Sequence, residues 1–263
     1  MSKFGYIPDK PDVRDFKVTR ATAPVKIPKS IDYTADMTGV ENQLNEGTCV
    51  AFATVAVKEY QEKKEWKTDL DFSKRFIYQE CKKIDEIPDE EGTYPRCAVA
   101  VLLKKGVPPE SCWRYIPNMI GTPCKNADDL ALPNRIEGYW RVDADIDALR
   151  ESLFLNGPIL VGIDVYSGFE KAEDGVIPMP AEDEAYLGGH AICLVGYNDG
   201  NKLFKFKNSW GRLWGDGGYG HLPYEYVEPY LSDAWACRDF LGEEREPTWW
   251  QRFVAFLKSL FHW

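Results

Sequence analysis

The chain has 263 residues, of which 44% are hydrophobic and 14% aromatic, a composition typical of a folded globular protein and not of a disordered one. Its formal net charge is -10, and no basic stripe offsets that charge, which argues against binding of nucleic acid. The sequence contains no run of 18 or more apolar residues, so no membrane-spanning helix is expected.

The first residues lack the apolar segment of a signal peptide, and seven cysteines are spread along the chain. We therefore expect a protein made in the cytoplasm, with mostly reduced thiols. Non-classical secretion and association with a membrane surface remain open as alternatives. In an oxidising compartment, six cysteines could pair and leave one reactive thiol.

Residues 1–29 are rich in Pro, Asp and Lys and show little helical periodicity, which predicts an extended N-terminal arm. Two interpretations of this arm are open. It could pack on the protein surface as a plain extension, or it could cross a cleft in the domain that follows and restrain activity.

The segment 42–53 combines an extended approach, a tight turn and the start of a helix at Cys49. Apolar residues recur behind Cys49 with helical spacing, and we expect the helix to end near 66–69. A thiol at a helix N-terminus faces the positive end of the backbone dipole, which favours the thiolate and lowers the thiol pKa. Gln43 lies six positions before Cys49, so its side-chain amide can point back toward the thiol, as an acyl-transfer site requires.

The middle of the chain continues with helical segments. A second helix is predicted near 71–78 with Ser73 as its cap, and a third over 98–105, ended by Gly106. Residues 116–140 are rich in Pro and Asn, and we interpret them as the crossing between two halves of the protein.

The second half is predicted to be mostly β-structure. An amphipathic helix over 145–156 is ended by Gly157-Pro158 and followed by a buried strand over 159–166. His190 then begins an apolar strand, and a second, alternating strand ends at Asn208.

The turn between these last two strands is Asn198-Asp199-Gly200-Asn201, which has strong hairpin chemistry. His190 and Asn208 can therefore lie side by side on paired strands. Together with Cys49 and Gln43 they complete a Cys-His-Asn set with an upstream amide.

At this point the sequence resembles the papain-like cysteine peptidases, in its prokaryotic form, over about residues 28–240. Three ordered blocks carry the resemblance: Gln43…Cys49-x-x-Phe52, Gly189-His190-Ala191…Val195-Gly196-Tyr197, and Asn208-Ser209-Trp210-Gly211-x-x-Trp214-Gly215-x-x-Gly218-Tyr219. The opening 6–16 also resembles the start of prokaryotic members.

The resemblance implies an α+β fold of two lobes in residues 30–240. The left lobe would be helical, the right lobe an antiparallel β-barrel-like structure, and the active-site cleft would lie between them. It implies a cysteine endopeptidase in which Cys49 is the nucleophile, His190 the acid and base, and Asn208 the group that orients His190. The Gln43 amide would stabilise the oxyanion.

The resemblance also implies substrate contacts from the residues that match the cleft walls: Gly47, Gly92, Thr93, Pro95, Gly189 and Trp210. Thr93 replaces a family glycine, so we expect a narrower pocket beside it. The glycines at 188 and 189 favour a roomy pocket instead, and the sequence leaves the two effects open.

Two rival functions are open at this stage. An acyltransferase or amidase would use the same triad, and a non-catalytic peptide-binding relative would have its cleft closed by the N-terminal arm. A metal site is a poor candidate because the chain has no Cys-x-x-Cys and only three histidines. We expect no cofactor, and a polypeptide as the substrate.

Residues 241–263 form a C-terminal amphipathic tail beyond the region of resemblance. Its last part, 249–263, places one apolar stripe on a helix: Trp250, Phe253, Val254, Leu257, Leu260 and Phe261. This stripe favours packing on the protein's own core or on a second subunit, and the alternative is contact with a membrane surface.

Overall fold

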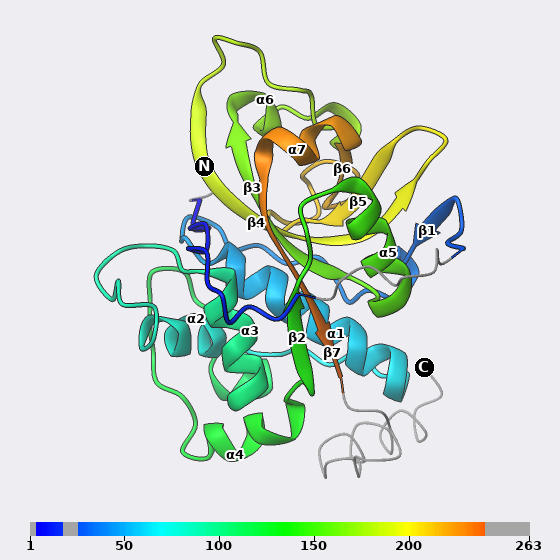
Figure 1. Cartoon of the computed structure of the whole chain (residues 1–263). Helices are drawn as coiled ribbons and strands as arrows, with labels where there is room; N and C mark the ends of the chain where they lie inside the picture. Colours follow the sequence, from blue (N-terminus) through cyan, green and yellow to red (C-terminus); the bar gives the residue numbers. More distant parts are fainter. Residues whose placement is uncertain (1–3, 18–25, 240–263) are drawn as a thin grey trace.

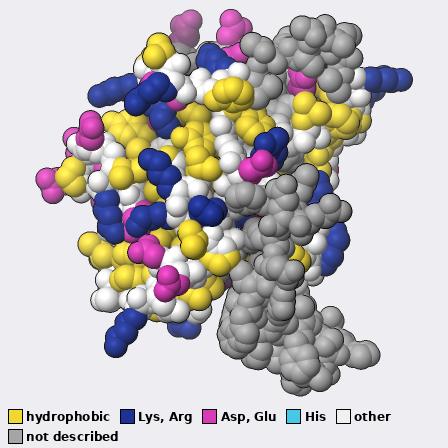
Figure 2. Space-filling model, turned by 60° about the horizontal axis from the view of Figure 1, so that its bottom comes forward, with side chains coloured by type: hydrophobic (Ala, Val, Ile, Leu, Met, Phe, Trp, Pro, Cys, Tyr) yellow, Lys and Arg dark blue, Asp and Glu magenta, His cyan; other side chains and the backbone are white. Residues whose placement is uncertain are grey.

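The computed structural model describes residues 4–17 and 26–239 (Figure 1). The predicted tail, with its proposed subunit or membrane contact, therefore lies outside the described residues. Within them, no helix has both the length and the apolar character needed to cross a membrane. On the face shown in Figure 2, Lys and Arg side chains are scattered singly, with hydrophobic side chains between them.

The α-helices of the described residues are α1 Cys49–Trp66, α2 Lys74–Lys82, α3 Pro95–Lys104, α4 Ala127–Ala131, α5 Ile146–Asn156, α6 Ser167–Glu170 and α7 Val227–Tyr230. The strands are β1 Ser30–Asp32, β2 Gly138–Arg141, β3 Ile159–Tyr166, β4 Tyr186–Asn198, β5 Leu203–Lys207, β6 Tyr219–Pro223 and β7 Leu231–Arg238. Short 3-10 turns lie at Thr34–Asp36, Glu110–Cys112, Leu132–Asn134, Glu173–Gly175 and Tyr224–Tyr226.

Helix α1 begins at Cys49, as the sequence predicts, and ends at Trp66, where Lys67 adopts a left-handed conformation (φ 53°). Its first three turns are buried almost without interruption. Figure 1 shows α1 running between the sheet on one side and α2, α3 and α4 on the other. This central position explains why α1 is apolar around most of its circumference near Cys49.

The other predicted helices are largely confirmed. Ser73 caps α2 by accepting a hydrogen bond from the Phe76 N–H at 3.0 Å. Helix α3 begins at Pro95, three residues earlier than expected, because proline at the first helical position is preorganised for a helix. The crossing segment 116–140 contains α4 and most of β2, two elements too short to leave a periodic signal.

The strands form an antiparallel sheet in the order β2-β7-β3-β4-β5-β6, with β1 paired to β4. The expected barrel-like lobe is therefore wrong in this detail, because the sheet stays open and β2 and β6 lie at its two ends. Pairing of β3 with β4 places Ile163 opposite His190, and the pairing of β4 with β5 shifts register between Leu194 and Gly196.

Two hydrophobic cores lie on the two faces of this sheet. Leu160 of β3 and Val195 of β4 point into the core shared with the helices, whereas Val161 and Leu194, their neighbours in sequence, point into the core under α5 and α7. The helices and the sheet thus share one core, which includes Cys49 of α1 and Ala191 of β4.

All seven cysteines lie within the described residues. Cys112 and Cys124 form a disulfide, and the other five are free thiols, four of them buried. The expectation of mostly reduced thiols is met except at this pair, which closes the loop after α3.

Candidate active site

Cys49 is the first residue of α1 and is fully buried. Loop 42–48 leads into it, and the backbone N–H groups of Ala191 and Gly5 lie beside its thiol. Ala191 follows His190 on β4, so the fold brings the predicted cysteine and the predicted histidine strand together across the boundary between helices and sheet.

His190 and Asn208 lie side by side, as their strands predict. The Nε2 atom of His190 is 2.8 Å from the Oδ1 atom of Asn208, and both residues are buried. The Nδ1 atom of His190 is buried without a hydrogen-bond partner among the described residues. Trp210 covers the histidine ring, with 4.9 Å between ring centroids. The pairing to Asn208 leaves Nδ1 as the nitrogen that can exchange a proton with another group.

Gln43 is held in place by Ser209, whose hydroxyl donates to the Gln43 Oε1 atom at 2.6 Å. The Gln43 backbone N–H donates to the Ser209 carbonyl at 2.9 Å. Its side-chain Nε2 donates to the Glu46 carbonyl at 2.8 Å, inside the same loop. The side-chain amide is therefore oriented from both ends and lies in the loop that leads to Cys49.

The electrostatics of Cys49 differ from the sequence expectation. Burial raises the pKa of its thiol to about 11, and nearby backbone N–H groups lower it only in part. Burial likewise lowers the pKa of His190 to about 4, against a smaller raising effect of Asn208. Burial thus disfavours the charged forms of both groups, because neither the thiolate nor the imidazolium is solvated by water here.

The N-terminal arm lies in the cleft and excludes water from Cys49 and His190. The Thr93 N–H donates to the Gly5 carbonyl at 3.0 Å, and the Ile7 N–H donates to the Thr93 carbonyl at 3.2 Å. On the opposite wall, the Tyr6 N–H donates to the Gly189 carbonyl at 3.1 Å. Figure 1 shows this dark blue segment between the helices and the sheet. An extended polypeptide therefore occupies the cleft through its backbone.

The side chain of Tyr6 fills a closely fitted pocket. Its hydroxyl donates to the Asp233 carboxylate at 2.5 Å, and Asp233 is buried. A Cβ atom on Gly162 would lie 2.2 Å from the Tyr6 ring, so this position requires glycine. Phe4 packs edge-on against His190, with 6.1 Å between centroids.

Beyond Tyr6 the arm is fixed by hydrogen bonds to Asp9 and an ion pair of Asp15. The Asp9 carboxylate accepts hydrogen bonds from the Arg96 N–H at 3.1 Å and the Trp235 indole at 2.9 Å. Arg96 also pairs with Asp15 at 2.7 Å. These contacts extend from the cleft to the start of α3 and to β7.

Most of the predicted substrate-contact residues face the arm. The backbone of Gly47 lies against Gly5, Gly92 approaches the Gly5 carbonyl, and Thr93 and Gly189 bond the arm as described. Pro95, in contrast, begins α3. The Thr93 hydroxyl donates to Asp85 at 2.9 Å. Because the side chain is held by Asp85, its position gives no support to the expected narrowing of the pocket beside it.

Sequence reasoning missed Tyr6, Asp233 and Phe169, which packs on His190 and Trp210. Tyr6 and Asp233 are 227 residues apart. Asp233 lies in an alternating strand segment, Leu231-Ser232-Asp233-Ala234, where an acidic residue normally indicates a solvent-facing position. No local signal identifies it as buried.

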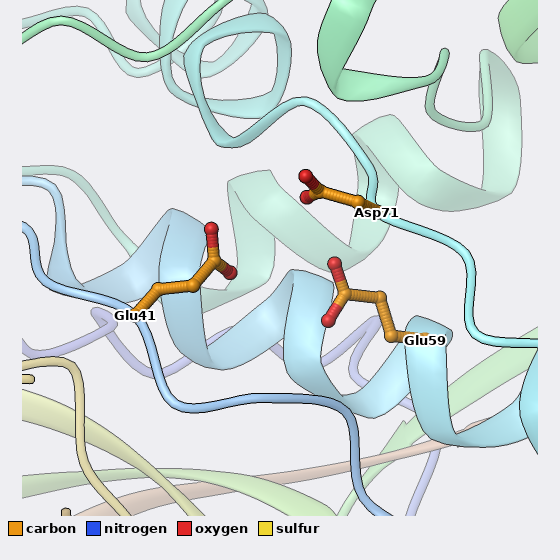
Figure 3. A group of neighbouring side chains, drawn as sticks. All are labelled: Glu41, Glu59 and Asp71. Atoms are coloured by element: carbon orange, nitrogen blue, oxygen red, sulfur yellow. The ribbon is translucent and has the colours of Figure 1, made fainter. Parts of the chain in front are cut away.

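A cluster of carboxylates includes Glu59 of α1. Figure 3 shows Glu41, Glu59 and Asp71 pointing toward one another from three segments, and such groups can hold a metal ion. The ammonium of Lys74 already lies among them, at 2.5 Å from Glu41, 3.1 Å from Glu59 and 2.6 Å from Asp71. This lysine supplies the positive charge that the carboxylates need.

The fold and this site define a class of protein, namely a two-lobed thiol-dependent hydrolase with a buried Cys, His and Asn at the junction of its lobes. The sequence profile described as the papain family cysteine proteases matches residues 27–228. The chain belongs to this family and is a cysteine protease.

Individual relatives agree with this assignment. An uncharacterised peptidase C1-like protein of Acanthamoeba polyphaga mimivirus is 30% identical over 271 residues, covering 90% of this chain and 86% of its own. Xylellain, a cysteine protease from Xylella fastidiosa, has a structure with a TM-score of 0.82 and 31% identity, covering 91% of this chain and 97% of its own. A Carica candamarcensis cysteine protease, solved with E-64, shares the fold at a TM-score of 0.65 and 23% identity, covering 82% of this chain and 100% of its own.

Proposed function

We propose that the protein is a cysteine endopeptidase in which Cys49, His190, Asn208 and Gln43 carry the reaction. The observation that carries the proposal is the pairing of His190 Nε2 with Asn208, which leaves Nδ1 without a described partner on the strand next to Cys49. A histidine held by one nitrogen and free at the other is suited to move a proton to and from a thiol.

The reaction follows from these positions. Once water enters the cleft, His190 takes the thiol proton and Cys49 Sγ attacks the carbonyl carbon of a peptide bond. The Gln43 amide and the Cys49 backbone N–H stabilise the oxyanion. The C–N bond breaks as His190 gives its proton to the leaving amine. Water then gives a proton to His190 and attacks the thioester, the C–S bond breaks to release the acid, and the proton on His190 returns to Cys49 Sγ.

The substrate class is an extended polypeptide. The arm binds the cleft through backbone hydrogen bonds to Thr93 and Gly189, and a substrate main chain offers the same donors and acceptors. These contacts do not depend on side-chain identity, so they favour a protein or peptide over a small amide.

We further propose that the arm holds the full chain inactive. Gly5 lies beside the Cys49 thiol, and its carbonyl is bonded to Thr93. A substrate would need the same space and the same hydrogen bonds. Cys49 and His190 have no exposed surface while the arm is in place.

Replacement of Tyr6 tests both proposals in the full chain. Tyr6→Ala removes the phenol from its pocket and the hydrogen bond to Asp233, so we expect at least about a tenfold gain in hydrolysis of a fluorogenic peptide, since loss of a buried aromatic side chain costs a few kcal/mol of docking. Val13→Ala is the matched control in the arm, because Val13 is fully exposed.

A second candidate function is favoured by the occupied cleft itself. A non-catalytic relative would also have a buried, neutral Cys49 and His190 under its arm. In that case Tyr6→Ala would increase peptide binding without any cleavage. Added amine nucleophiles in the same assay separate hydrolysis from acyl transfer, because transfer would give amide products in place of free acids.

A further inference from the structure

Glu46, in the loop that carries Gln43, forms a buried ion pair with Arg75 of α2. The carboxylate oxygens of Glu46 lie 2.6 Å and 2.7 Å from the two terminal nitrogens of Arg75. Arg75 is fully buried in α2, and the Glu46 side chain is 11% exposed. A bidentate pair of this kind fixes both the position and the orientation of the two side chains.

The loop 112–124, closed by its disulfide, adds a third segment to this pair. The Asn118 N–H donates to Glu46 at 2.9 Å, and Arg75 donates to the Ile116 carbonyl at 2.7 Å. The Arg75 guanidinium also stacks on the Tyr115 ring at 4.8 Å. Burial disfavours the charged form of Glu46, but the hydrogen bonds and charge of Arg75 outweigh it and keep the pKa of the carboxyl below its ordinary value.

The same contacts reach both ends of the catalytic loop. The Tyr115 hydroxyl donates to the Gln43 carbonyl at 2.8 Å and lies 2.9 Å from the Thr48 hydroxyl, next to Cys49. The Glu46 backbone carbonyl, in turn, accepts the hydrogen bond from the Gln43 side-chain amide. The two groups proposed to stabilise the oxyanion, the Gln43 amide and the Cys49 N–H, thus lie on either side of the point where Glu46 is held.

We propose that Glu46 and Arg75 are positioning residues that set the separation of the two oxyanion donors, and so act on acylation and not on formation of the thiolate. This inference rests on the proposed peptidase function. The inference predicts different effects on two reactions of Cys49. Alkylation of a thiolate by iodoacetamide displaces iodide and forms no oxyanion, whereas peptide hydrolysis passes through an oxyanion.

The test uses the full chain carrying Tyr6→Ala, so that the cleft is open. Glu46→Gln keeps the shape and removes the charge, and we expect kcat for a peptide substrate to fall by about 10- to 100-fold, somewhat less than the loss of a whole oxyanion donor. The rate of Cys49 alkylation should stay within about twofold, since no oxyanion is involved. Arg75→Lys keeps the positive charge but loses the bidentate contact with Glu46. Its kcat should lie between those of Tyr6→Ala alone and the Glu46→Gln variant.

Glu62→Gln is the matched control. Glu62 forms an equally buried pair with Lys58 at 2.8 Å, further along α1 and away from the loop. It should leave kcat unchanged, and thermal unfolding of each variant verifies that it is folded. Unchanged kcat in Glu46→Gln overturns the inference, and so does a parallel fall in kcat and alkylation, which would mean that the pair only maintains the fold. If neither the wild type nor Tyr6→Ala, both with Glu46 and Arg75 intact, cleaves peptide, the proposed function fails and the inference fails with it.

Discussion

His190 depends on one side-chain hydrogen bond for its orientation, and that bond comes from Asn208. The ring is also held by aromatic contacts with Trp210 and Phe169, so its burial does not depend on Asn208 alone. The hydrogen bond therefore selects which ring nitrogen carries the proton, and the aromatic contacts fix the ring plane.

Replacement of Asn208 tests this division of roles. We expect Asn208→Ala to lower kcat/KM of the open protein by about 10- to 100-fold, because a misoriented acid-base group loses most of its advantage. Asn201→Ala, at an exposed position of the adjacent hairpin, should have no effect. Steady-state peptide hydrolysis measures both variants, and equal activity of the two would contradict the assigned role.

The residues that could be predicted from the sequence are those within distinctive strings, such as Gln43, Cys49, His190 and Asn208. Those that could not be predicted depend on partners far away in the chain. Glu46 lies in the predicted loop before Cys49, but its pairing with Arg75 follows only from the packing of α2 on the loop.

Among the elements, the N-terminal arm has the clearest pH dependence. Burial, and then the charge of Asp233, raise the pKa of Asp9 to about 7, although Arg96 opposes this. Asp233 is itself paired with Arg141, and the Trp235 indole donates to Asp9. A raised carboxyl pKa in the docked state means that docking takes up a proton. Docking is thus strongest in acid and weakens as pH rises from about 4, the ordinary carboxyl value, to about 7.

Asp9→Asn separates the pH dependence of arm docking from the titration of Cys49 and His190, because those two residues are the same in the wild type and in the variant. The ratio of wild-type to Asp9→Asn peptidase activity should be near one at pH 4 and rise toward pH 7, by up to about tenfold per pH unit for one proton. Asp12→Asn removes the same charge from a partly exposed arm position that pairs with Arg14, another residue of the arm, and should show no such rise. A flat Asp9→Asn ratio across this range would contradict the account.

The elements that could be predicted are the long, periodic ones. Helix α1 and strand β3 have the expected bounds, because their apolar patterns extend over enough residues to fix them. Helix α4 and strand β2, of 5 and 4 residues, could not be predicted, since elements this short are determined by their neighbours. The sequence favours neither interpretation of the arm, because the arm's contacts are to Thr93, Gly189 and Asp233, far along the chain.

For the molecule as a whole, one core joins the helices to the sheet, and both Cys49 and Tyr6 of the arm belong to it. The predicted barrel-like lobe is an open sheet, because strand order is set by pairing between distant segments and not by the pattern of any one strand. The arm closes the cleft by adding its own contacts to both lobes. In the described residues, Cys49 and His190 are therefore assembled beside each other and fully covered.

The most direct test of this account is the rate of iodoacetamide alkylation of Cys49 against pH, with the labelled peptide mapped, in three full-length proteins: the wild type, Tyr6→Ala, and Tyr6→Ala with His190→Ala. The account predicts slow labelling of the wild type, because Cys49 is buried with a pKa of about 11. It predicts rapid labelling of Tyr6→Ala well below pH 7, and loss of that labelling without His190. Labelling of Tyr6→Ala that stays slow up to the ordinary thiol pKa would contradict the account, because no reactive thiolate would then lie beneath the arm.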